Sequence, residues 1–99
     1  MLTITAIIRV KPGQDEIMRQ TLLDVAKNVQ ANEPDTIGFF ISQDAGDACL
    51  FTTYERFADQ TAMDRHNGSA AVAKFFALAK PLLDGPVTLV TSREISAKA

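Results

Sequence analysis

The sequence of 99 residues holds one cysteine, one histidine, one tyrosine and no tryptophan. A lone cysteine excludes a disulfide within the chain and fits a reducing compartment, and we expect Cys49, between apolar neighbours, to be an inert buried thiol. No Cys/His cluster has the spacing of a metal site, and the five scattered glycines form no phosphate-binding loop. The sequence therefore predicts neither a metal nor a cofactor.

Long apolar runs and clusters of positive charge are missing as well. No segment reaches the roughly 18 apolar residues of a membrane span, and residues 1–10 lack the charged start of a signal peptide. A net charge of -2 without a basic run argues against nucleic acid or an anionic membrane as a partner. We expect a cytoplasmic protein with a single domain over residues 1–99.

Two kinds of apolar spacing divide the chain into strands and helices. Alternation over residues 2–10 predicts a first strand. Apolar residues at helical spacing follow from Asp15 until Pro34 ends the helix. The remaining predicted elements are a strand over 37–43, a turn over 44–47, a strand over 48–57, a short helix over 59–66, a helix capped by Ser69 that reaches Leu83, a strand over 87–95 and a frayed tail over 96–99.

This order, β-α-β-β-α-β with a split second helix, predicts an α+β fold of the ferredoxin-like kind: an antiparallel sheet with its helices on one face. The strands nevertheless carry large apolar residues on both faces, in the pairs Phe39/Phe40, Phe51/Leu50 and Leu89/Val90. An open apolar face usually marks an interface. We therefore expect a homodimer whose sheets pack face to face; the alternative is that a monomer tolerates these side chains on its surface.

The segment Leu50–Phe57 (LFTTYERF), followed by Ala62 and His66, resembles the antibiotic-biosynthesis monooxygenase family. Its members often have Tyr-Glu, an aromatic two residues on, and then a helix with Ala and His four apart. The resemblance runs over nearly the whole chain. It implies a dimeric α/β barrel that oxidises a hydroquinone-like or polycyclic aromatic small molecule with dioxygen, without metal or flavin.

Two branches similar to this family imply other reactions. Heme-degrading relatives use an Asn on the first strand, a Trp near the second helix and a His about ten residues later. This chain has no Asn before Asn28, no Trp, and Phe76 ten residues after His66, so we expect no heme chemistry. An isomerase of a phosphorylated quorum signal resembles the chain in Tyr54-Glu55, His66 and Gly85-Pro86 but has a second His that is absent here. It stays an alternative, as do a non-catalytic small-molecule-binding stress-response dimer and a structural dimer without ligand.

His66 is the leading candidate for catalysis, because histidine takes and gives a proton near neutral pH. We expect it to deprotonate a phenol or to anchor the substrate in a pocket between sheet and helices; the alternative is a hydrogen bond to a backbone carbonyl. Tyr54 is expected to hydrogen-bond the substrate, unless it only fills the core. Glu55 alternates to the opposite face and is expected to pair with Arg9 or Arg93. The expected substrate-binding residues, which could equally be core or, for the arginine, surface, are Phe51, Phe57, Met63, Phe76 and Arg65.

Overall fold

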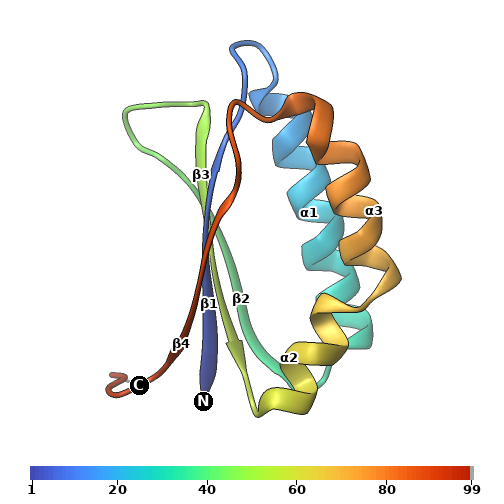
Figure 1. Ribbon diagram of the computed structural model, residues 1–99, viewed down its shortest axis with the longest axis vertical. Helices are drawn as coiled ribbons and strands as arrows, with labels where there is room; N and C mark the ends of the chain where they lie inside the picture. The colour runs from blue at the N-terminus through green and yellow to red at the C-terminus, as the bar shows by residue number, and fades with distance from the viewer. Residues whose placement is uncertain (99) are drawn as a thin grey trace.

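The computed structural model describes residues 1–98 and has three helices on one face of a four-stranded antiparallel sheet (Figure 1). The strands lie in the order β2-β3-β1-β4, with β1 paired to both β3 and β4. The predicted ferredoxin-like α+β fold is confirmed. In chain order the elements are β1 (Leu2–Arg9), α1 (Asp15–Asn32), β2 (Thr36–Gln43), β3 (Leu50–Phe57), α2 (Gln60–Asn67), α3 (Ala70–Ala79), the 3₁₀ turn η1 (Lys80–Leu82) and β4 (Thr88–Arg93).

Caps divide the second helical region into two. The Asp59 side chain accepts the backbone N–H of Ala62 at 2.8 Å and begins α2. The Ser69 hydroxyl accepts the backbone N–H of Val72 at 3.2 Å and begins α3, as the sequence predicted. Because each helix has its own N-cap, the chain turns between them, and His66 comes to lie in the last turn of α2.

The last helix ends earlier than its apolar spacing predicted. Residues 80–82 tighten into a 3₁₀ turn that contains Pro81, and the chain then pairs with the end of β1. The backbone N–H of Lys11 donates to the Leu82 carbonyl at 2.9 Å, and that of Asp84 donates to the Arg9 carbonyl at 2.8 Å. These backbone hydrogen bonds replace the final helical turn, and β4 is also shorter than predicted.

The helix-facing side of the sheet builds the core. Alternation along β1 buries Ile4, Ala6 and Ile8. The stripe of α1 packs with Ala6 and Ile8, whereas Ile4 packs with Phe57, Ala62 and Met63. α1 and α3 lie side by side above this face (Figure 1). None of the described helices is long and apolar enough to cross a membrane. The buried residues of α1 and α3 are Met18, Thr21, Leu22, Val25, Val29, Phe75 and Ala79.

The other face of the sheet carries exposed apolar side chains. A row of paired residues, Phe40, Tyr54, Thr5 and Val90, crosses all four strands. The rings of Phe40 and Tyr54 stack at 6.3 Å, and Phe40, Val90 and Tyr54 are all substantially exposed. We call this surface the open face. The prediction that both sides of the sheet bear apolar residues is confirmed, whereas the homodimer stays a prediction.

Replacing Phe51 by alanine should lower the free energy of unfolding by about 3–5 kcal/mol, because its side chain is 1% exposed and fills the core. Ile17→Ala, on the exposed side of α1, is the matched control and should change it by less than about 0.5 kcal/mol. Urea unfolding of both variants measures the difference. Equal effects would show that Phe51 does not support the core.

Candidate functional site

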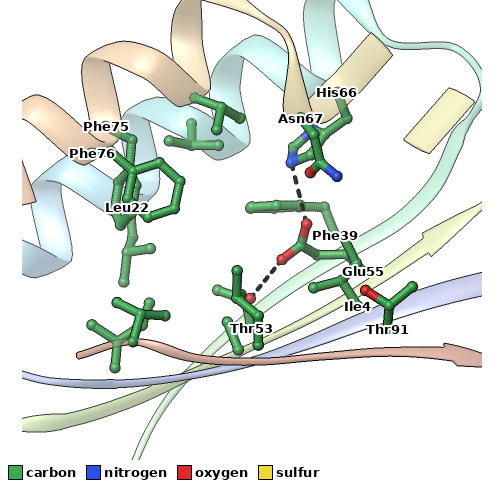
Figure 2. A pocket seen from close by; sticks show the side chains of 16 residues that line it. Ile4, Leu22, Phe39, Thr53, Glu55, His66, Asn67, Phe75, Phe76 and Thr91 are labelled. Atoms are coloured by element: carbon green, nitrogen blue, oxygen red, sulfur yellow. Dashed lines mark hydrogen bonds and ion pairs between the residues drawn. The ribbon is translucent and has the colours of Figure 1, made fainter. Parts of the chain in front are cut away.

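A pocket of about 310 Å³ lies between the sheet and the helices α1 and α3 (Figure 2). Its apolar end is closed by Leu22, Phe75 and Phe76, and its polar end by Glu55 and His66. Phe76 and Leu89 are 43% and 55% exposed, which places the mouth at the edge of the sheet formed by β4. The other lining residues are Ile4, Ala6, Ile8, Val25, Phe39, Thr53, Asn67, Val72, Val87 and Thr91.

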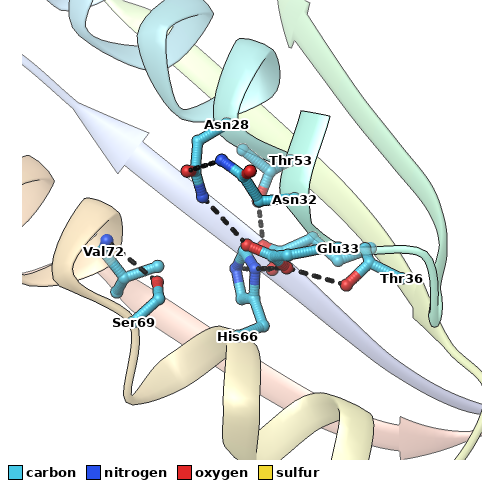
Figure 3. A network of polar contacts seen from close by, with 9 residues as sticks. Asn28, Asn32, Glu33, Thr36, Thr53, His66, Ser69 and Val72 are labelled. Atoms are coloured by element: carbon cyan, nitrogen blue, oxygen red, sulfur yellow. Dashed lines mark hydrogen bonds and ion pairs between the residues drawn. The ribbon is translucent and has the colours of Figure 1, made fainter. Parts of the chain in front are cut away.

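At the polar end, the imidazole of His66 lies between two carboxylates. Its Nδ1 is 2.7 Å from Oε1 of Glu33, the residue that follows α1 (Figure 3). Its Nε2 is 3.2 Å from Oε1 of Glu55 on β3 (Figure 2). The rings of Phe39 and Phe57 flank it, with centroids at 5.7 and 5.3 Å. His66 is only 4% exposed, so α1, β3 and α2 meet at one buried ring.

Further hydrogen bonds hold both carboxylates. Glu33 accepts from the Thr36 hydroxyl at 2.8 Å and from the Asn28 amide at 3.2 Å (Figure 3). Glu55 accepts from the Thr53 hydroxyl at 2.7 Å through Oε2. Among the described side chains, no buried polar atom lacks a hydrogen-bond partner. Such a satisfied network fixes the position of each member.

The two carboxylates decide the charge of His66. Burial disfavours the charged ring, but the hydrogen bonds to Glu55 and Glu33, together with their negative charges, outweigh it and raise the pKa of His66 above 6.5. In the cationic ring both nitrogens carry a proton and donate to the carboxylates. His66 therefore has no free basic nitrogen, and the basic group that faces the pocket is the carboxylate of Glu55.

Comparisons with known proteins place this chain in a family. A family model described as antibiotic biosynthesis monooxygenase matches residues 1–78. The chain belongs to this family. No curated protein gave a significant match.

Several solved structures match this chain over nearly their whole length and have the same fold. A protein from Pseudomonas aeruginosa is 24% identical, with a TM-score of 0.86, over 96% of this chain and 94% of its own. One from Mycobacterium tuberculosis is 18% identical, with a TM-score of 0.90, over 99% and 98%. One from Nitrosomonas europaea, whose name carries the family description, is 18% identical, with a TM-score of 0.89, over 97% and 100%. At these identities the likeness concerns the fold.

The pocket of this family member contains two of the seven predicted site residues, His66 and Phe76. Phe51 is covered by the main core, and Phe57 lies against the far side of the imidazole. Met63 packs with Phe57 in a small second cluster of the core. These three side chains are buried in the core but do not line the pocket.

Arg65 points outward. Its side chain is exposed and pairs with Asp35 at 3.3 Å on the surface. The structure therefore does not bring this cation to the pocket, and its position does not support the expected role in substrate binding.

Tyr54 lies on the open face, on the opposite side of the sheet from His66, so the expectation of a shared pocket was wrong. Its hydroxyl is 3.4 Å from Oε1 of Glu94. The expected pairing of Glu55 with Arg9 or Arg93 was also wrong, since Glu55 binds His66 and Arg9 binds Asp47 at 2.8 Å.

A sequence signal for Glu55 did exist. Side chains alternate between the two faces of a strand. Glu55 is an even number of residues from Phe51 and Phe57, so it lies on the same face as these two buried side chains. Thr53 lies on this face as well, and its hydroxyl donates a hydrogen bond to the Glu55 carboxylate. Glu33 and Asn67 gave no comparable signal, because they stand at helix ends whose positions depend on the whole fold.

The raised pKa of His66 predicts that stability declines with rising pH. Its contribution is fully present below the unfolded-state value of 6.5 and is lost as the pH rises through the higher folded-state pKa. The free energy of unfolding should fall across this window by about 1.4 kcal/mol for each unit by which the two values differ. Urea unfolding at a series of pH values from about 5 to about 9, which spans the ordinary His pKa of about 6.5, measures this decrease in the free energy of unfolding. His66→Gln should flatten the plot of the free energy of unfolding against pH. An unchanged slope in this variant would show that other groups cause the pH dependence.

Proposed function

We propose that this protein is a cofactor-independent monooxygenase that oxidises a hydroquinone-like or polycyclic aromatic molecule with dioxygen. One observation carries the proposal: a single buried carboxylate, Glu55, stands at the end of an apolar pocket with phenylalanine walls. At about 310 Å³ the pocket is large enough for aromatic rings, since a cavity of about 150 Å³ already holds benzene. Membership of the monooxygenase family supports the same reaction.

The roles follow from the polarity of the pocket. The rings of Phe75 and Phe76 hold the aromatic body of the substrate, and a substrate hydroxyl reaches Glu55. The carboxylate takes the phenolic proton, because a phenolate gives an electron to dioxygen more readily than a phenol does. The phenolate gives one electron to dioxygen, and the resulting radical and superoxide combine to form a C–O bond. Glu55 returns its proton to this peroxide anion. The Glu55 carboxylate then removes the hydrogen of the same carbon, the O–O bond breaks, and the departing hydroxide takes that proton and leaves as water. His66 is the cation that pairs with Glu55 and holds it in place.

The charges of the pocket argue against the alternative isomerase. A phosphorylated substrate needs a cation, and among the described lining residues there is no Lys or Arg. His66 directs both ring nitrogens to carboxylates, and Glu55 would repel a phosphate. A non-catalytic binder would have the same apolar pocket, and the activity experiment separates it from an enzyme.

Dioxygen uptake with a panel of hydroquinones tests the reaction. Glu55→Gln should lower kcat by about 100-fold, because a neutral amide cannot accept the phenolic proton. Glu16→Gln, which changes an exposed carboxylate on α1, is the matched control and should leave kcat unchanged. Uptake at the autoxidation background with every quinol would contradict the proposal and leave a binding protein.

The proposal includes a homodimer, in which the open faces of two chains pack together as a dimeric α/β barrel. The exposed apolar residues Ile7, Phe40, Tyr54 and Val90 support it, since a face of this kind is costly to leave in water.

Sedimentation at micromolar concentration should give twice 10.8 kDa for the native chain. Phe40→Asp should shift it to the monomer, because a charge would be buried between the two sheets. Leu78→Asp, on the exposed side of α3, is the control and should sediment as the native protein does. A native monomer would exclude the face-to-face dimer.

A further inference from the structure

His66 is shared by two separate cavities. The large pocket is lined by His66 and Glu55. A second, small hollow lies on the other side of the ring and is lined by His66 and Glu33. The two carboxylates therefore face different cavities, and the imidazole between them joins the two. The other residues of the hollow are Asp35, Thr36, Ala62 and Arg65.

The hollow has the size and polarity of a water site. Its volume of about 10 Å³ is close to the smallest space that holds one water molecule. The carboxylate of Glu33 and the hydroxyl of Thr36 offer hydrogen-bond partners, and the exposed ion pair of Asp35 and Arg65 forms its outer rim. A water molecule here lies next to Glu33 without passing through the pocket mouth.

We propose that Glu33 and His66 form a proton path to solvent at this hollow: when Glu55 gains a proton in the pocket, His66 releases its Nδ1 proton through Glu33, the residue that positions the imidazole. The path is the series of hydrogen bonds from Glu55 through Nε2 and Nδ1 to Glu33, with distances of 3.2 and 2.7 Å. It uses the pocket of the proposed function but not its dioxygen step, so it holds for any reaction that protonates Glu55.

The proton balance follows from the charges. When a hydroxyl in the pocket gives its proton to Glu55, an O–H bond breaks and another forms, and His66 loses one of its two anionic neighbours. The Nδ1–H bond of the imidazolium then breaks, and the proton passes to Oε1 of Glu33 and on to water. His66 remains neutral with its proton on Nε2. The reverse sequence restores the imidazolium, and no electron is transferred.

Few other charges contact the ring. The imidazole contacts Glu33 at the end of α1 and Glu55 on β3. β2 and β3 otherwise present the uncharged rings of Phe39 and Phe57. Asp35 and Arg65 line the hollow and neutralise each other. The charge of His66 therefore responds chiefly to the two carboxylates.

Exchange of the His66 Nδ1 proton with water, followed by NMR below the His66 pKa, tests the path. The chain has one histidine, so the ring signals need no assignment among several. Glu33→Gln keeps an oxygen that accepts from Nδ1 but removes the proton acceptor, and should slow the exchange by more than about tenfold. Glu55→Gln is the matched control: both variants remove one carboxylate next to the ring, but this one keeps the contact of Nδ1 with Glu33 and should not slow the exchange.

The native protein gives a second test that needs no variant. With the pocket filled by 2-naphthol, a phenol used here only as an occupant, the Nδ1 exchange rate should stay as it is in the empty protein. Two results would overturn the proposed proton path. One is Nδ1 exchange that stops when 2-naphthol fills the pocket, and the other is exchange that is as fast in Glu33→Gln as in the native chain. These results are independent of dioxygen uptake, so the path and the proposed reaction can fail separately.

Discussion

A buried imidazole between two carboxylates determines how three parts of this protein meet. The end of α1 supplies Glu33, β3 supplies Glu55, and α2 supplies His66. Any one of these groups left alone in the interior would be costly, because a buried charge needs a partner. The three are stable only together, so the network that carries the candidate chemistry also fixes the arrangement of the polar half of the core.

Side chains of β3 point alternately to the two faces of the sheet, so the two faces carry different groups. Glu55 and Thr53 face the helices and form the polar end of the pocket. Tyr54 and Arg56 face the other way, where both contact Glu94. Neighbouring residues of one short segment thus belong to two surfaces separated by the thickness of the sheet. A motif that is continuous in the sequence is not one site in space.

The same alternation explains how far the sequence could predict the structure. Local spacing was enough for the strands, the α1 stripe and the Ser69 cap, because each depends on neighbours in the chain. His66 was found because it is unique. Its partner Glu33 lies 33 residues away and meets it only after the sheet and both helices have packed, so no local pattern could reveal the pair.

β4 is an edge strand and forms one wall of the pocket. β4 pairs with β1 alone, and all six of its residues are exposed, so little besides that one set of backbone hydrogen bonds keeps it in place. Its residues Leu89 and Thr91 line the pocket. Elements with few buried contacts open most often under native conditions. We therefore expect β4 to open more often than the other strands, and each opening to widen the pocket for a bulky molecule.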